Sequence, residues 1–370
     1  MQFSQSPASR RQFLRQFAVG GAAVATGIAF PNLLLAQAAP RKPLGVALLG
    51  LGTYATTQLA PALQQTKSCR LVGVVSGHPE KITKWQKDFS LAEKNCYNYE
   101  NFDRIAENQD IDIVYVVTPN TLHRDFVVRA AKAGKHVICE KPMGGSVAEC
   151  DAMIAACAAA KVKLSVGYRM HFDPNVQEMM RLQQTKEFGE FTKLTGNFSF
   201  VFGKHAWRVE KKLAGGGPLM DIGIYVIQAA CMAAGATPLA VTAHEEPKER
   251  PEFFVDVEEA LTFKLEFPNG TTLEARTSYN DHANTFRAEG AKGWIEFTDN
   301  AFSYTVGKVT TSKGDLNFPV VNQQALQMDD FADCLRTGRE SEVGGTMGRR
   351  DLKIIEAIYE AARTGKRVTV

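Results

Sequence analysis

Three residues of this chain have the types and spacing needed to remove hydrogen from a carbon that bears a hydroxyl group. Lys141 lies in the run Glu140-Lys141-Pro142, and Asp221 and Tyr225 stand four residues apart after a glycine-rich segment. Residues four apart on a helix share one face. A tyrosinate held by a nearby ammonium group can take the hydroxyl proton, and Asp221 would orient a substrate hydroxyl or tune Lys141. The alternative is a surface lysine and an ordinary amphipathic helix with a capping aspartate.

A turn earlier in the chain has the glycine spacing of a dinucleotide-binding loop. The apolar run GVALLG is followed by Gly50-x-Gly52-x-x-Ala55. The first glycine permits a tight turn, the second lets the backbone approach a pyrophosphate, and the small third residue lets helix pack on strand. Amides at the helix N-terminus would face the anion. The alternative is a plain glycine turn, but the pattern opens a strand–helix series, as the motif requires.

The end of the second strand favours NADP over NAD. NAD sites commonly carry an acidic residue there for the ribose 2′-hydroxyl. This chain instead has Ser76-Gly-His-Pro-Glu-Lys81, so Ser76 offers a hydrogen bond and Lys81 a positive charge to a 2′-phosphate. The alternative is that Lys81 is a solvated helix lysine.

The elements around these residues predict an α/β protein whose N-terminal part is a doubly wound, Rossmann-type parallel sheet. Apolar runs recur in GVALLG, CRLVGVVSG, DIDIVYVVTP, KHVICEKP and KLSVGY. Helix-like segments separate them at Leu59–Gln65, Lys81–Phe89, Leu122–Ala133 and Val147–Ala160. Continuously apolar strands alternating with helices are typical of a parallel sheet covered on both faces. Ligands bind beyond the carboxyl ends of such strands, where Lys141 follows the strand HVIC.

The second half predicts an α+β domain with a large, open, mostly antiparallel sheet. A helix at Phe172–Gln184 precedes strands in FTKLTGNFSFVF, ALTFKLEF, TTLEARTSY, TFRAEGAKGWIEFT and FSYTVGKVTT. Helices at Gln323–Leu335 and Arg349–Ala362 close the chain. A wide open sheet often buries its face against a second subunit, so we expect a homodimer.

Bulk composition excludes several classes of partner. The net charge is +3 without any block of like charges, so we expect no nucleic acid partner. The seven histidines are dispersed and no zinc-type Cys/His cluster occurs, so we expect no metal. The seven cysteines are scattered, which suits core residues of a chain that folds in the cytoplasm.

The N-terminus resembles a twin-arginine export signal. Arg10 and Arg11 precede an apolar stretch from Phe17 to Phe30, and Ala36-Gln37-Ala38 offers small residues for cleavage. We therefore expect a signal at 1–38, the export machinery as partner, a periplasmic location and no stable membrane insertion. The alternatives are an amphipathic helix or an uncleaved anchor. An NADP-binding domain would span 39–165, and a substrate-binding and dimerisation domain 166–370.

Five motifs in this order resemble the Gfo/Idh/MocA oxidoreductase family. They are Gly50-Leu-Gly-Thr-Tyr-Ala, Thr118-Pro-Asn-Thr-Leu-His123, Cys139-Glu-Lys-Pro, Gly167-Tyr-Arg169 and Asp221-Ile-Gly-Ile-Tyr225. Many relatives in the family carry histidine at the position of Tyr225. Tyrosine there, together with Trp207-Arg208 and the Ala-Gly-Gly-Gly run, resembles the sugar-oxidoreductase branch. The resemblance implies tightly held NADP, an aldose oxidised at C1 to a lactone, and a second sugar reduced to an alditol.

The resemblance also implies residue roles. Lys141, Asp221 and Tyr225 would be catalytic, with Tyr225 the proton acceptor and donor. The cofactor site would be lined by Gly50, Gly52, Thr53, Tyr54, Ala55, Ser76, Lys81, Tyr99, Pro119, Asn120, His123, Glu140, Lys141, Arg169, Trp207 and Arg208.

The chain departs from that branch in one respect, and other functions stay open. Only Ala39 to Pro43 would remain between signal and first strand, whereas a branch relative has a long arm over a neighbouring subunit's cofactor. This favours a dimer over a tetramer and leaves permanent cofactor retention open. The alternative functions are a dehydrogenase with exchangeable cofactor, an exported NAD-dependent glycosidase, and a cofactor-loaded sugar-binding protein without turnover.

Overall fold

The computed structural model describes residues 42–370, so the expected signal at 1–38 lies outside the described residues. The N-terminal sheet has the strands β1 (Leu44–Leu49), β2 (Cys69–Val75), β3 (Cys96–Tyr97), β4 (Ile113–Val116), β5 (His136–Cys139) and β6 (Leu164–Val166). All are parallel, in the order β3-β2-β1-β4-β5-β6. This arrangement confirms the predicted Rossmann-type sheet.

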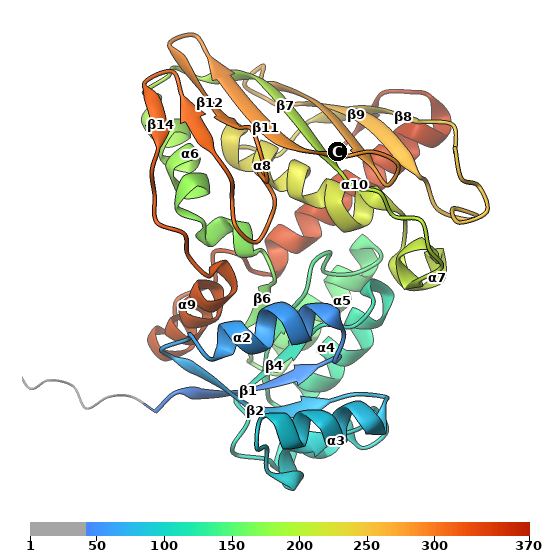
Figure 1. Ribbon diagram of the computed structural model, residues 1–370, viewed down its shortest axis with the longest axis vertical. Helices are drawn as coiled ribbons and strands as arrows, with labels where there is room; N and C mark the ends of the chain where they lie inside the picture. Colours follow the sequence, from blue (N-terminus) through green and yellow to red (C-terminus); the bar gives the residue numbers. More distant parts are fainter. Residues whose placement is uncertain (1–41) are drawn as a thin grey trace, which may run out of the picture. The chain divides into compact units, whose positions relative to one another are not determined.

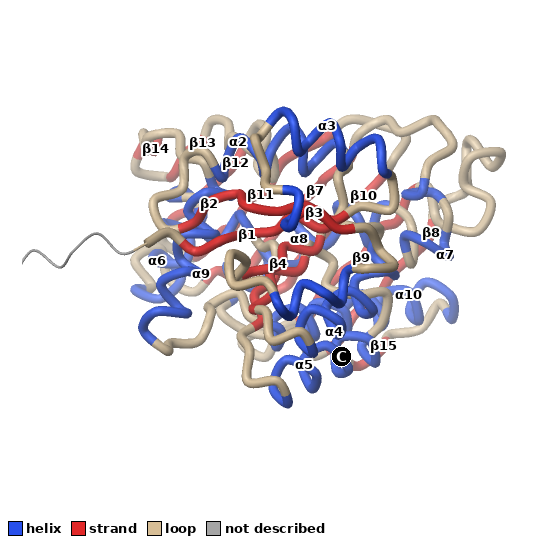
Figure 2. The backbone as a smooth tube through the Cα atoms, turned by 90° about the horizontal axis from the view of Figure 1, so that it is seen from below, coloured by secondary structure: helices blue, strands red, loops and turns tan. Residues whose placement is uncertain are grey.

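Alternate residues of these strands face opposite helix layers. Val46 and Leu48 of β1 pack in one apolar cluster, whereas Ala47 and Leu49 pack in another. Figure 2 shows α3 (Pro79–Asp88) on one side of the strands and α4 (His123–Lys132) and α5 (Val147–Ala159) on the other. Both faces are buried, which explains why the strands are continuously apolar.

The second sheet has nine strands and is open on one face. Its order is β14-β13-β12-β11-β7-β10-β9-β8-β15, and only the β7–β10 pair is parallel. The strands are β7 (Phe191–Ser199), β8 (Ala240–Glu245), β9 (Ala260–Glu266), β10 (Thr272–Ser278), β11 (Ala283–Gly290), β12 (Gly293–Phe297), β13 (Val309–Thr311), β14 (Gly314–Leu316) and β15 (Val368–Thr369). The mostly antiparallel character is as predicted.

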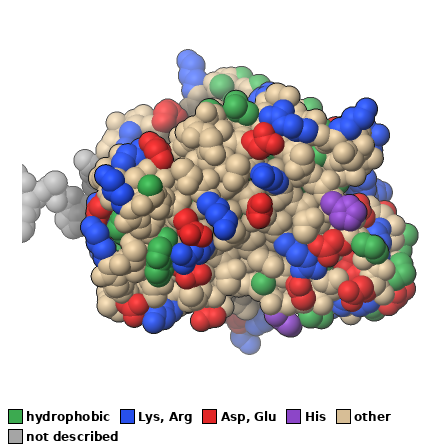
Figure 3. All heavy atoms as spheres, turned by 90° about the horizontal axis from the view of Figure 1, so that it is seen from above, with side chains coloured by type: hydrophobic (Ala, Val, Ile, Leu, Met, Phe, Trp, Pro, Cys, Tyr) green, Lys and Arg blue, Asp and Glu red, His purple; other side chains and the backbone are tan. Residues whose placement is uncertain are grey.

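Among residues 42–370, helices cover only one face of this sheet. In Figure 1, α6 (Pro174–Thr185), α8 (Ile224–Ala234) and α10 (Gly345–Thr364) lie below the sheet, toward the N-terminal domain. Figure 3 views the molecule from the opposite side, above the sheet, where basic and acidic side chains are interspersed without one dominant charge. A shallow hollow of about 590 Å³ in the uncovered sheet face is lined by residues such as Thr242, Thr262 and Arg276.

Two features differ from the sequence-based expectations. The run FSYTVGKVTT forms a strand only at Val309–Thr311, because Phe302–Tyr304 turn away as a loop. Helix α9 (Gln323–Thr337), expected within the C-terminal domain, packs Met328 and Phe331 into the apolar cluster on the N-terminal sheet.

The segment Lys211–Ala234 is long and apolar enough to span a membrane, but 89% of its most apolar window is buried in the protein core.

Candidate functional site

A cavity of about 680 Å³ collects most of the predicted site residues. Its walls come from the loops after β1, β2, β4 and β5 and from segments of the C-terminal domain. Among the predicted residues it is lined by Gly50, Gly52, Thr53, Tyr54, Ser76, Lys81, Tyr99, Pro119, Asn120, Glu140, Lys141, Arg169, Trp207, Arg208, Asp221 and Tyr225. The cavity therefore lies at the carboxyl ends of the parallel strands, where open α/β sheets bind ligands.

Two predicted cofactor residues, Ala55 and His123, do not line this cavity. Ala55 is fully buried in the apolar cluster beneath the loop, where its small side chain lets the following helical turn pack on the sheet. His123 is also fully buried, and its ring nitrogens lie 3.0 Å from the Pro142 oxygen and 2.9 Å from the Thr118 oxygen. Burial lowers its pKa to about 4. His123 thus bridges the two loops that contain Thr118 and Pro142, and it positions these loops at the border of the cavity.

The glycine turn has the backbone geometry that its motif requires. Gly50 has φ +103°, and a Cβ there would lie 2.6 Å from the Val117 carbonyl oxygen. A Cβ on Gly52 would meet nothing within 4 Å, because Gly52 faces the open cavity. Gly50 therefore serves the turn itself, and Gly52 leaves the backbone accessible to a ligand.

Alanine substitutions at Gly50 and Gly52 are expected to have different effects, one on stability and the other on dinucleotide binding. Gly50→Ala should destabilise the protein by about 3 kcal/mol, since it combines a left-handed φ with a backbone collision. Gly52→Ala should leave the free energy of unfolding within about 0.5 kcal/mol but weaken dinucleotide binding, because its methyl group enters the cavity. Denaturant unfolding and NADP titration of both variants measure these effects. Equal destabilisation by the two variants would contradict this assignment.

The loop after β2 groups polar side chains at one end of the cavity. Ser76 is buried, and its hydroxyl oxygen accepts a hydrogen bond from the His78 amide at 3.1 Å. Lys81 and His78 both line the cavity. The Tyr99 ring packs against Gly77, where a Cβ would lie 2.8 Å from the ring. Sequence reasoning missed His78.

Lys141 connects the other two predicted catalytic residues. Its Nζ donates a hydrogen bond to the backbone oxygen of Asp221 at 2.6 Å and to Oδ1 of Asp221 at 3.4 Å. The same nitrogen lies 4.6 Å from the centre of the Tyr225 ring. Burial disfavours the charged form of Lys141, but the negative charges of its neighbours, chiefly Tyr225 and Asp221 when ionised, leave its pKa raised. Lys141 is therefore a cation in this site.

The Asp221 carboxylate lies beside two cationic side chains and accepts a hydrogen bond from a tyrosine hydroxyl. Its Oδ2 accepts hydrogen bonds from Arg208 Nε at 3.1 Å and from the Tyr279 hydroxyl at 2.7 Å. Burial raises the pKa of this carboxyl, but Lys141 and Arg208 outweigh burial and lower it to about 2. Asp221 is thus ionised throughout the physiological range. Sequence reasoning missed Tyr279, which lies on a distant strand end.

The glycine-rich run before Asp221 serves close packing. A Cβ on Gly216 would lie 2.0 Å from the Tyr359 hydroxyl, and one on Gly217 would lie 2.2 Å from the Glu258 backbone oxygen. The Glu258 carboxylate accepts hydrogen bonds from the amides of Gly217 at 2.9 Å and Leu219 at 3.0 Å. The run therefore anchors the short π-helical segment Leu219–Gly223 that carries Asp221.

Aromatic side chains that were not predicted form much of the cavity wall. Phe198, Phe200 and Phe202 alternate along β7 and its extension, so they share one side of the chain. This alternation is visible in the run FSFVF and could have identified them. Phe302 and Tyr304 come from a loop between β12 and β13, and nothing in their local sequence marks them as site residues.

The residues present fit a nicotinamide dinucleotide. Thr118 lines the cavity after β4, and its buried hydroxyl has no hydrogen-bond partner among the described residues. A buried polar group without a partner is costly, so it marks a place for a polar ligand atom. The unpartnered Thr118 hydroxyl, the accessible backbone at Gly52 and the polar side chains around Ser76 therefore offer contacts to separate parts of a bound dinucleotide. No cluster that could hold a metal ion occurs within residues 42–370.

Comparison with known proteins identifies the family. Residues 44–168 match the oxidoreductase family with an NAD-binding Rossmann fold, and residues 176–296 match the GFO/IDH/MocA C-terminal domain. The crystal structure of aldose–aldose oxidoreductase from Caulobacter crescentus, complexed with glycerol, is 43% identical, with a TM-score of 0.86 over 89% of this chain and 100% of that chain. D-xylose 1-dehydrogenase [NADP(+)] from Haloarcula marismortui is 30% identical over 89% of this chain and 93% of its own length. The chain therefore belongs to the GFO/IDH/MocA oxidoreductase family.

Proposed function

We propose that this protein oxidises an aldose at C1 to its lactone and reduces a second sugar to an alditol, with NADP kept bound between the two steps. The observation that carries the proposal is the Lys141–Asp221–Tyr225 cluster at the carboxyl ends of the parallel strands. The similarity to aldose–aldose oxidoreductase supports an aldose substrate, and the similarity to an NADP-dependent xylose dehydrogenase supports the cofactor.

In this mechanism the protein moves protons and orients the sugar. A bound nicotinamide would supply the hydride-accepting and hydride-donating chemistry. Tyr225 takes the proton of the C1 hydroxyl in the first step and returns it to the carbonyl oxygen of the second sugar. The Lys141 Nζ lies 4.6 Å from the centre of the Tyr225 ring, so a cationic group stands beside the residue that exchanges the proton. Asp221 holds Lys141 in place through two acceptor atoms.

The cavity walls suit an uncharged sugar. The aromatic rings of Phe198, Phe200 and Phe202 offer apolar surface to the C–H faces of a sugar ring and exclude water. Trp207 has the Arg208 guanidinium 4.5 Å from its ring centre, and only the Nε of Arg208 is engaged with Asp221. The remaining guanidinium nitrogens are available to sugar hydroxyl groups, because each carries donors.

For the cofactor, Ser76, His78 and Lys81 would hold the 2′-phosphate. Lys81→Ala is expected to weaken NADP binding by about 10- to 100-fold, the range for loss of a charge-assisted hydrogen bond, and to leave NAD binding unchanged. Fluorescence titration of the apoprotein with NADPH and NADH measures the ratio. Lys84→Ala is the matched control, because Lys84 lies on the same helix and pairs with Asp88 on the surface. Equal losses for both cofactors would contradict the NADP assignment.

Location and assembly are also part of the proposal. With a twin-arginine signal at 1–38, the chain would fold and load its cofactor in the cytoplasm and then work in the periplasm. There, a second sugar would regenerate the cofactor without an external supply. The uncovered face of the nine-stranded sheet would form a homodimer interface. We propose the Rossmann part, 39–165, for cofactor binding and 166–370 for substrate binding and dimerisation.

Purification without added cofactor tests the proposed function. The expected result is near-stoichiometric nicotinamide, which an aldose reduces and a second sugar reoxidises, followed in the near-ultraviolet absorbance. A protein that arrives empty and turns over only with added NAD would overturn the retained-cofactor cycle. Release of sugar from a glycoside with no net oxidation would instead identify a glycosidase.

A further inference from the structure

An aromatic pair connects the two domains at the edge of the cavity. The rings of Tyr54 and Tyr304 are stacked, with centroids 5.7 Å apart and planes inclined by 29°. Tyr54 lies in the helical residues directly after the glycine turn of the N-terminal domain, and Tyr304 lies in the loop between β12 and β13. Both line the cavity, and Tyr304 is 44% exposed, so the pair lies where the cavity meets solvent.

We propose that Tyr304 is a cofactor-retaining residue that closes the site by stacking on Tyr54. The proposal rests on the retained-cofactor function stated above. Tyr54 directly follows the glycine turn that would hold the pyrophosphate, so its stack with Tyr304 spans the cavity next to a bound dinucleotide. Aromatic pairs prefer such offset-stacked arrangements.

Buried Arg169 holds the base of the Tyr304 loop. Its guanidinium lies 4.6 Å from the centre of the Tyr304 ring and donates hydrogen bonds to the backbone oxygens of Phe302 at 2.6 Å and Ser303 at 2.8 Å. The Asn284 side chain accepts from the Phe302 amide at 2.8 Å and donates to the Ser303 hydroxyl at 3.0 Å. The loop is thus fixed up to residue 303, and Tyr304 is directed toward Tyr54.

Arg169 also links this closure to the proposed catalytic residue. The same guanidinium lies 5.1 Å from the centre of the Tyr225 ring, so it stands between Tyr225 and Tyr304. Arg169 is only 2% exposed, and burial lowers its pKa, but nearby tyrosines, chiefly Tyr225, raise it above its ordinary value. A permanent buried cation therefore faces both rings.

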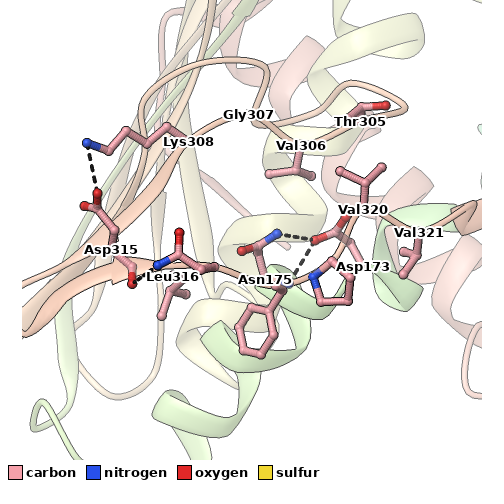
Figure 4. Close-up of a pocket in the computed structure, with 13 residues that line it drawn as sticks. Asp173, Asn175, Thr305, Val306, Gly307, Lys308, Asp315, Leu316, Val320 and Val321 are labelled. Carbon is pink, nitrogen blue, oxygen red and sulfur yellow. Dashed lines mark hydrogen bonds and ion pairs between the residues drawn. The ribbon is translucent and has the colours of Figure 1, made fainter.

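Beyond Tyr304 the loop has space behind it. A second cavity of about 430 Å³ is lined by Thr305, Val306, Gly307 and Lys308 on one side. Figure 4 shows Asp173 and Asn175 facing these residues, with the Asp173 carboxylate accepting from the Asn175 amide at 2.9 Å. Within this segment Val306 packs against the hydrophobic core, whereas Thr305 and Lys308 are exposed and border the second cavity.

The rate of cofactor release tests this role directly. Protein loaded with NADPH is mixed with excess NADP, and the loss of bound-NADPH fluorescence is followed. Tyr304→Ala is expected to release NADPH about 10- to 100-fold faster than the wild type, a range that corresponds to the loss of one aromatic and one cation–π contact. Tyr304→Phe keeps the ring and should restore slow release. A rate in Tyr304→Ala within about twofold of wild type, below the effect of one such contact, overturns the proposal.

Two further variants make the test specific. Phe318→Ala is the matched control, because Phe318 is an aromatic residue of similar exposure, 43%, that borders the second cavity and not the first. It should release NADPH at the wild-type rate, and an equal acceleration would show a general loop effect and overturn the proposal. Tyr54→Ala combined with Tyr304→Ala should accelerate release by less than the product of the single effects, as expected for residues in contact.

The outcome also separates this proposal from the proposed function. If the wild-type protein purifies without nicotinamide, the retained-cofactor cycle is wrong. The stacking role is then judged by the affinity for added NADPH. A dissociation constant unchanged in Tyr304→Ala overturns it, and a weakening of about 10-fold or more supports it.

Discussion

Replacing Tyr225 with phenylalanine is expected to slow the reduction of bound cofactor by an aldose by about 10²- to 10⁴-fold, the range for loss of a general acid–base group. The phenyl ring keeps the contacts with Lys141, Arg169 and the neighbouring aromatic residues, but it offers no oxygen to the sugar proton. The cofactor should stay bound. Single-turnover absorbance of the reduced nicotinamide after mixing with excess aldose measures the rate.

Tyr97→Phe is a suitable control for this variant. Tyr97 is 7% exposed and Tyr225 is 8% exposed, so both changes remove one hydroxyl from a buried ring. The Tyr97 hydroxyl accepts from Asn108 and does not line the cavity, so its loss should leave the reduction rate unchanged. A near-normal rate in Tyr225→Phe would remove Tyr225 as the acid–base residue.

Asp221→Asn is expected to destabilise the protein by about 3 kcal/mol, because it leaves two partly buried cations, Lys141 and Arg208, without their shared counterion. It should also lower the reduction rate by about 100-fold or more, since Lys141 loses the group that orients it. Denaturant unfolding gives the stability, and the single-turnover assay gives the rate.

The pH dependence of unfolding tests whether the lost charge of Asp221 causes the loss of stability in Asp221→Asn. The pKa of Asp221 is lowered from 3.8 to about 2 in the folded protein. A lowered carboxyl pKa stabilises the fold above the unfolded-state value, and this contribution is lost as pH falls from about 4 toward 2. The wild type should therefore lose about 2 kcal/mol more than Asp221→Asn over that interval. Equal acid dependence of the two proteins would show that Asp221 is not held as the structure indicates.

Tyr279→Phe provides a graded comparison at the same carboxylate. It removes one of the hydrogen bonds to Oδ2 of Asp221 and leaves Lys141 and Arg208 in place. Its cost should therefore be smaller, about 1 kcal/mol. A larger loss than in Asp221→Asn would indicate that Tyr279 acts through its packing against Phe200 and Phe254.

The sequence by itself determined the features that depend on local pattern. The apolar runs and their intervening helices predicted the parallel sheet, because a strand buried on both faces must be apolar throughout. The Gly50–Gly52 turn could be predicted because its backbone conformation depends on the residue types at a few neighbouring positions. The placement of Lys141 after HVIC followed from the rule that parallel strands end at the same edge.

Only the tertiary structure decided which distant residues complete the site. Tyr279 meets Asp221 from 58 positions away, and Tyr304 meets Tyr54 from the other domain. Conversely, His123 and the glycines at 216 and 217 have motif-like positions, but their contacts are with buried backbone and side chains rather than with the cavity. Such contacts arise when two layers bury their apolar faces against each other, and burial depends on the whole chain. Local sequence therefore predicts where a strand ends and a turn begins, whereas the packing of one domain against another decides which side chains meet there.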